Sequence, residues 1–302
     1  MSNQSRNFES FQIQFLPPVY GIEFCLAFTG NILAIWLMLT RERRNWHTGV
    51  VFAFNLALSD LLYALTLPLL VHYYRHQKDW QFGMAMCKME RFLFTCNLYS
   101  SIFFVTCISL NRYVGIVHPF FMHSHVRARH AKLASVGVWL VVTVISCPVL
   151  SFATVTTGWR NNTECVSFRK EGYSTSFAYN VFLAVFGCFL PFLATFASYF
   201  SILWVVWKNE NITRLEKRKV AVMIATVVMM YTVSFIPYHV LRNYNIHLKL
   251  EHSISSHTTV VYSAYQVTKG LVTLNMCIHP LLYMAVFDSI LRTLCCRGAT
   301  KE

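Results

Sequence analysis

The chain has 302 residues, of which 55% are hydrophobic, 16% are aromatic and only 13% carry a charge. Soluble domains are about one-quarter charged, so this composition excludes a soluble enzyme and a disordered chain. A net charge of +13 is typical of some nucleic-acid-binding proteins, but here the basic residues lie between long apolar runs. The composition therefore predicts an integral membrane protein that contacts the lipid bilayer and binds no nucleic acid.

Seven stretches are long and apolar enough to cross a bilayer, which takes about 20 residues. They cover residues 18–39, 49–74, 84–117, 131–153, 176–207, 220–245 and 258–287. The third and seventh are weaker by hydropathy because they contain Arg91, Arg112 and Lys269. The alternation of a membrane barrel is not seen, so we expect an all-α membrane protein. Residues 1–17 are then an extracellular segment, 18–287 a seven-transmembrane helix bundle, and 288–302 a cytoplasmic tail with a short interfacial helix.

The distribution of charge predicts the orientation of the bundle. The loops and tail on one side contain twice as many Lys and Arg residues as those on the other, and excess positive charge stays in the cytoplasm. We therefore expect a multi-pass plasma-membrane protein with its N-terminus outside and its C-terminus inside. Cys87 and Cys165 then lie at the outer face, where disulfides persist. Glycosylation sequons that begin at Asn3 and Asn161 also face outward.

A single carboxylate, Asp60, lies in the middle of the second span, where a bare charge is costly. One reading is a neutral acid that is hydrogen-bonded to Asn31 of the first span. The other is a small-cation site, with sodium as an allosteric ligand, that Asp60 shares with Ser101 and Asn275. The residues alone leave both readings open. Prolines that bend the spans are Pro68, Pro148, Pro191, Pro237 and Pro280.

Several landmarks occur in the order and spacing of a known family. They are Asn31, residues 56–60, Cys87, Arg112-Tyr113, Trp139, Pro191, residues 235–237 and residues 280–283. Over all seven spans the chain thus resembles the rhodopsin-like G-protein-coupled receptors. Residues 92–97, 106–113, 237–239 and 265–271 are similar to those of the purinergic nucleotide receptors, in particular the ATP-preferring metabotropic subtype. The resemblance implies a receptor for an extracellular nucleotide such as ATP that signals through heterotrimeric G proteins.

The residues themselves also predict an anion site, because three cations lie at a matched depth in the outer halves of three spans. Arg91 lies one helical turn inward of Cys87, and Arg242 and Lys269 lie in the sixth and seventh spans. Glu90 is adjacent to Arg91 and is expected to point to another side of its helix. One cation alone could extend to lipid headgroups or water, whereas three together favour a site for phosphate.

The resemblance implies that Arg91, Arg242 and Lys269 clasp the polyphosphate of the ligand. Further residues are expected to line the pocket, with simple helix packing as the alternative for the aromatic ones: Phe94, Thr95, Tyr99, His239, Tyr265 and Gln266. Many purinergic receptors have a second outer disulfide between the N-terminal segment and the third outer loop. This chain has no cysteine before Cys25 or within 245–257, so we expect a more mobile outer face.

The inner end departs from the superfamily at two positions. Asn111 precedes Arg112 where an acid is usual, and His279 precedes Pro280 where Asn or Asp is usual. Asparagine supplies no charge to restrain Arg112, so our hypothesis is elevated basal signalling. The resemblance implies that the following residues form the switch and the G-protein contact: Asn111, Arg112, Tyr113, Phe120, Phe235, Pro237, His279, Pro280 and Tyr283.

Two interpretations remain open at the inner face. Phe120 is either an apolar knob for the G-protein α subunit or a packing residue at the membrane interface. Cys295 and Cys296, with basic neighbours, fit palmitoylation of an interfacial helix.

Other functions are weighed against a nucleotide receptor. The main alternative is a receptor of the same fold for another anion, such as a dicarboxylate or a lysophospholipid. A lipid ligand would tolerate loss of one of the three cations and depend on an apolar lining. A membrane transporter is the alternative of another class, but no internal repeat supports it. An opsin would need a lysine where the seventh span has Thr273. No enzyme, metal site or cofactor is expected apart from the sodium ion, because no nucleophile–base pair or metal-ligand cluster is seen.

Overall fold

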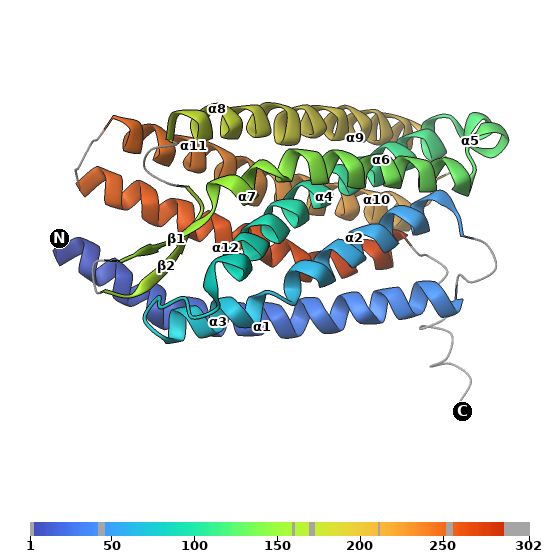
Figure 1. Cartoon of the computed structure of the whole chain (residues 1–302). Coiled ribbons are helices and arrows are strands. Elements are labelled where there is room, and N and C mark those ends of the chain that lie inside the picture. Colours follow the sequence, from blue (N-terminus) through green and yellow to red (C-terminus); the bar gives the residue numbers. More distant parts are fainter. Residues whose placement is uncertain are drawn as a thin grey trace.

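The computed structural model describes residues 3–41, 46–158, 161–168, 173–210, 212–251 and 256–286. Within these ranges the chain is a bundle of long helices with a small β-hairpin at one end (Figure 1). We refer to this as the hairpin end, and to the end that carries the short helix α5 (Pro119–His125) as the opposite end. The all-α membrane bundle expected from the sequence is confirmed, with the hairpin as an unpredicted addition.

The longer elements match the predicted spans, and two of them are interrupted by a turn of π-helix. The helices are α1 (Asn3–Arg41), α2 (Thr48–Ala64), α3 (Leu67–Arg75), α4 (Gly83–Val117), α6 (Ala128–Ser146), α7 (Pro148–Phe152), α8 (Tyr173–Ala184), α9 (Leu190–Lys208), α10 (Arg214–Met229), α11 (Ile236–Leu250) and α12 (Ser256–Val286). The π-helical turns are Val185–Phe189, between α8 and α9, and Met230–Phe235, between α10 and α11.

Six helical segments of the described chain are long and apolar enough to cross a membrane. The seventh predicted span corresponds to α12, which is a continuous helix packed against α1 and α11. The first span differs from expectation at its start, because α1 begins at Asn3 and continues through Pro17 and Pro18. Hydropathy therefore marked where the apolar part of α1 begins, at residue 18, and not where the helix begins.

Prolines divide several of the spans. Pro68, Pro148, Pro191 and Pro237 each lie at the first or second position of a new helix, where the missing N–H of proline costs nothing. The π-helical turns immediately precede the helices that contain Pro191 and Pro237. A wider turn removes the clash between a proline ring and the carbonyl of the preceding turn. Pro280, by contrast, lies within α12.

The hairpin consists of β1 (Thr154–Thr157) and β2 (Thr163–Val166), paired antiparallel with Val155 opposite Cys165. The predicted disulfide between Cys87 and Cys165 is present and ties β2 to the first turn of α4. A second tie is Asp79, whose carboxylate accepts a hydrogen bond from the N–H of Thr163 at 2.9 Å. This bond, with a further one from Gln81, lowers the pKa of Asp79. The hairpin is thus held over the end of the bundle by covalent and polar contacts.

Candidate ligand-binding site

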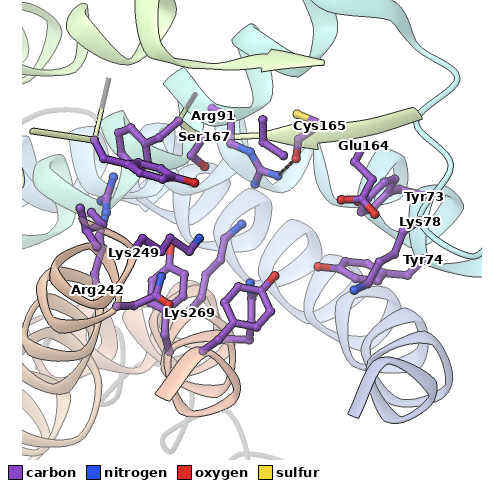
Figure 2. A pocket seen from close by; sticks show the side chains of 18 residues that line it. Tyr73, Tyr74, Lys78, Arg91, Glu164, Cys165, Ser167, Arg242, Lys249 and Lys269 are labelled. Atoms are coloured by element: carbon purple, nitrogen blue, oxygen red, sulfur yellow. Dashed lines mark hydrogen bonds between the residues drawn. The ribbon is translucent and has the colours of Figure 1, made fainter. Parts of the chain in front are cut away.

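A cavity of about 180 Å³ opens at the hairpin end, between the hairpin and the ends of α3, α4, α11 and α12. Among the lining residues that the structure describes, five are cations and one, Glu164, is a carboxylate. Figure 2 shows the nitrogen ends of Arg91, Lys249 and Lys269 pointing into the same space. The structure therefore brings together the three predicted cations and two that were not predicted: Arg91, Arg242, Lys269, Lys78 and Lys249.

Arg91 is held between the hairpin and its own helix. Its Nη2 donates to the carbonyl oxygen of Cys165 at 3.0 Å, and its Nη1 lies 3.0 Å from Oε2 of Glu90. The expectation that Glu90 points elsewhere is therefore wrong. Neighbouring side chains leave a helix about 100° apart, but a long arginine can bend back across that angle. Glu90 is completely buried, so Arg91 enters the cavity with its charge already partly balanced.

Arg242 and Lys269 both contact aromatic rings. Arg242 donates from Nη1 to the hydroxyl of Tyr238 at 2.8 Å, and its guanidinium lies 5.5 Å from the ring of Phe168. Nζ of Lys269 lies 4.8 Å from the ring of Phe94. Within the described part of the chain neither residue forms an ion pair with a carboxylate. Cation–π contacts are weaker than charge-assisted hydrogen bonds to an anion, so both cations can gain energy from an anionic ligand.

The two unpredicted cations that line the cavity come from α11 and from the turn after α3. Lys249 follows Arg242 by seven residues, which is two helical turns along the same face of α11, and its Nζ lies 5.6 Å from the ring of Tyr262. That spacing was a usable signal in the sequence. Lys78 follows the end of α3 in a left-handed turn, with φ of 65°. No sequence pattern predicts that this turn directs Lys78 into the cavity.

The other residues predicted to line the pocket fall into three groups. Tyr265 and Gln266 line the main cavity. Phe94 and Thr95 line a smaller, deeper space that also contacts the three predicted cations. Tyr99 and His239 lie below both spaces, completely or almost completely buried, with ring centroids 5.7 Å apart.

A glycine explains the position of Tyr99. A Cβ atom added at Gly187 would lie 2.5 Å from the ring of Tyr99, a distance at which one of the two must move. Gly187 belongs to the π-helical turn Val185–Phe189, so that turn approaches α4 closely at this point. Tyr99 therefore packs as the floor beneath the cavity.

The carboxylate of Asp60 makes two polar contacts with side chains in the middle of the bundle. Its Oδ1 accepts from Nδ2 of Asn97 at 2.8 Å, and its Oδ2 lies 2.7 Å from Nδ1 of His279. Asn31 instead donates to the carbonyl oxygens of Ala27 and Met276. The proposed hydrogen bond between Asp60 and Asn31 is therefore replaced by bonds to Asn97 and His279.

The residues of the suggested sodium site lie near this centre without completing it. Oδ1 of Asn275 accepts from Ser234 at 3.3 Å, and Ser101 is buried on α4. Sodium binding at Asp60 stays a prediction, and His279 competes for the same carboxylate.

At the opposite end Arg112 lines two cavities of about 290 Å³ each. One lies toward α9 and α10, and the other lies toward Thr48 at the start of α2. Asn111 accepts a hydrogen bond from Thr48 through Oδ1 at 2.5 Å. This end of the bundle is thus hollowed around Arg112.

The remaining switch residues are placed as follows. Phe235 is buried against Tyr231. The hydroxyl of Tyr113 lies 3.3 Å from Nε2 of His118. Phe120 on α5 is 89% exposed, so the described part of the chain leaves this side chain almost entirely uncovered.

Some predicted sites lie outside what the structure describes. Cys295 and Cys296 lie outside the described residues. Tyr283 and Asn3 lie in described helices, but their side chains are not described. Asn161 is described and is exposed in the turn between β1 and β2, with φ of 61°.

Taken together, seven helical spans, a charged cavity at one end and an arginine-lined hollow at the other define a seven-transmembrane receptor. The family profile described as "7 transmembrane receptor (rhodopsin family)" matches residues 30–283. Human purinoceptor 11 is 41% identical over 310 residues, which cover 95% of this chain and 82% of the relative. Purinoceptor 1 of Gallus gallus is 38% identical over 94% of this chain and 79% of its own length, and that of Mus musculus is 37% identical over 94% and 77%. The chain belongs to the metabotropic purinoceptors, within the rhodopsin family of seven-transmembrane receptors.

This membership confirms the resemblance seen in the sequence. The protein is a G-protein-coupled receptor and a multi-pass protein of the plasma membrane. Receptors of this family are not enzymes, so the exclusion of an enzyme also holds.

Proposed function

We propose that the chain is the receptor for an extracellular nucleoside polyphosphate, with ATP as the first candidate, and that it signals through heterotrimeric G proteins. The observation that carries this proposal is the convergence of five cations on a cavity whose described lining includes one carboxylate. The name purinoceptor, which its relatives carry, supports a purine as the base.

The chemistry of the cavity suits a polyphosphate. The planar forks of Arg91 and Arg242 can each donate two parallel hydrogen bonds to a phosphate, and Lys269 adds a point charge between them. On binding, the phosphates would replace the aromatic contacts of Arg242 and Lys269 with stronger ones. Tyr265 and the other aromatic residues of the wall offer flat surfaces for the base.

For the orientation we propose that the hairpin end and the N-terminus are extracellular and that the C-terminus is cytoplasmic. The disulfide of the hairpin supports this orientation, because disulfides persist outside the cell. Within it, Asn3 and Asn161 are proposed glycosylation sites, and Cys295 and Cys296 are proposed palmitoylation sites. The exposure of Asn161 in a hairpin turn suits the first of these modifications.

For coupling we propose that the G protein enters the hollow around Arg112 and contacts Phe120. The exposure of Phe120 and the two cavities that Arg112 lines support this proposal. Pro237, with the π-helical turn before it, is the proposed hinge of α11.

The test is a ligand panel on cells that express the chain, with calcium and cyclic AMP recorded together. The panel contains nucleotides, dicarboxylates and lysophospholipids, applied to the wild type and to Arg91→Gln, Arg242→Gln and Lys269→Gln. We expect a nucleotide to be the agonist and each substitution to lower its potency by about 10- to 100-fold, since a hydrogen bond to a charged group contributes about 1.5–3 kcal/mol. Arg75→Gln is the matched control, because Arg75 is exposed on α3 and does not line the cavity.

Other outcomes point to the alternatives. A lysophospholipid response that tolerates loss of one of the cations would overturn the nucleotide proposal and indicate a lipid receptor. A dicarboxylate response that depends on two cations would indicate a receptor for that anion. Uptake of labelled nucleotide into vesicles without a G-protein response would indicate a transporter.

A further inference from the structure

Two histidines lie one helical turn apart near the end of α3. His72 is half-buried and His76 is exposed, and their ring centroids are 3.9 Å apart with 26° between the ring planes. A spacing of four residues places two side chains on one face of a helix. It is the spacing with which a helix presents two imidazoles to one zinc ion.

Hydrogen bonds around the pair fix which nitrogen of each ring carries the proton in the neutral form. Nδ1 of His76 lies 2.9 Å from the carbonyl oxygen of His72, which can only accept, so Nε2 of His76 keeps its lone pair. Gln81 donates from Nε2 to Oδ2 of Asp79 at 3.2 Å, which sets the orientation of its amide. Oε1 of Gln81 then accepts from Nε2 of His72 at 3.3 Å, and Nδ1 of His72 keeps its lone pair.

These contacts are the outer-shell bonds that orient metal-binding histidines, in which the second ring nitrogen donates to a carbonyl oxygen. We propose that His72 and His76 bind a divalent transition-metal ion of the zinc class, with water as the remaining ligands. The rings turn from their stacked arrangement until both lone pairs reach one ion, at about 2.0–2.1 Å. In the described residues no group of three or more His, Cys, Asp or Glu residues could hold a metal. Structural zinc sites have four protein ligands, so a site with two histidines is expected to bind the ion reversibly.

The position of the two histidines allows a bound metal ion to affect ligand binding in the cavity. The same turn of α3 carries Tyr73 and Tyr74, which line the cavity, and the turn after it carries Lys78. A bridge between His72 and His76 holds this last turn of α3, and the ion adds positive charge beside an anion site. Zinc outside the cell is therefore expected to raise the potency of the nucleotide. This consequence rests on the proposed function and orientation, whereas metal binding itself does not.

The first experiment measures metal binding without any nucleotide. A ligand that binds only the folded state raises the thermal unfolding midpoint, so zinc should raise that of the purified wild-type receptor. The rise should be lost in His72→Ala and in His76→Ala and kept in His123→Ala, the matched control, because His123 is an exposed histidine on α5 at the opposite end. Gln81→Ala should weaken zinc binding about tenfold by releasing the orientation of His72. No rise in the wild type, or an equal rise in both alanine variants, overturns the proposed site.

The second experiment measures regulation on intact cells, where zinc reaches only the extracellular face. Zinc should raise nucleotide potency about fivefold, at the lower end of typical coupling between sites. His72→Ala and His76→Ala should respond to nucleotide alone as the wild type does and should lose the zinc effect. Chelation of nucleotide by zinc acts on all variants alike, so an equal shift in every variant overturns the regulatory role. A raised unfolding midpoint with unchanged potency retains the metal site and overturns its effect on the ligand.

Discussion

The middle of the bundle and the cavity at the hairpin end balance their charges in opposite ways. In the middle, both oxygens of the Asp60 carboxylate have partners within the fold, Asn97 and the basic side chain of His279. At the hairpin end, the described part of the chain places five cations and one carboxylate around the same cavity. Charge that is balanced within the fold stabilises the fold, whereas charge that is left over at a cavity is available to a ligand.

The largest effect is expected where the internal balance is broken. His279→Ala leaves the buried carboxylate of Asp60 without its basic partner, and removal of one member of a buried pair costs about 3–5 kcal/mol of stability. The measurement is the free energy of unfolding of the purified receptor, compared between the wild type and His279→Ala.

A double substitution separates this charge effect from a simple cavity. Asp60→Asn in the His279→Ala background removes the unpaired charge, so it should recover a large part of the lost stability. If the double variant is no more stable than His279→Ala, charge balance is not what the pair contributes.

An intermediate effect is expected at Arg91. This cation lines the cavity, but it also has a charged partner within the fold, Glu90. Glu90 is the internal partner of Arg91 and competes with a phosphate for it. Glu90→Gln should therefore raise nucleotide potency about tenfold, which corresponds to about 1.4 kcal/mol. The measurement is a concentration–response curve, with Glu251→Gln as the control because Glu251 is an exposed acid at the end of α11. Lower potency in Glu90→Gln would show that Glu90 positions Arg91 and does not compete for it.

The smallest effect is expected at Asn111, whose side chain is bonded to Thr48 of the neighbouring helix. Asn111→Asp places a carboxylate beside Arg112 and should favour the inactive state by about 1 kcal/mol, which is roughly a fivefold decrease in activity without ligand. Cyclic AMP and calcium in unstimulated cells measure it, at matched surface expression. Unchanged or higher basal activity would contradict the hypothesis that Asn111 loosens the restraint on Arg112.

The sequence predicted those features that depend on periodic or local signals. Apolar runs located the spans, and matched depth brought together Arg91, Arg242 and Lys269, because helices in a bundle run nearly parallel. The start of α1 was missed because the largely polar helical turns before residue 18 leave no hydropathy signal.

Tertiary detail was not predictable in the same way. The ion pair of Arg91 with Glu90 depends on rotamers, and the approach of Lys78 depends on a left-handed turn. The hairpin between α7 and α8 has only four residues in each strand, and its position depends on contacts with Asp79 and Cys87 from distant parts of the chain. Tyr99 and His239 were expected in the wall because position along a helix gives the direction and depth of a side chain but does not show how far the cavity extends between the helices.

The π-helical turn Met230–Phe235 has a consequence for the rotational phase of α11. A π-helical turn contains one residue more than an α-helical turn, and one residue corresponds to about 100° of rotation about the axis. If the same sequence continued through this turn as a regular α-helix, every later side chain would be rotated by about that angle and Arg242 would be directed away from the cavity, whereas the π-helical turn absorbs the extra residue. The bulge therefore sets which face of α11 is turned toward the cavity, independently of the side chains that this face carries.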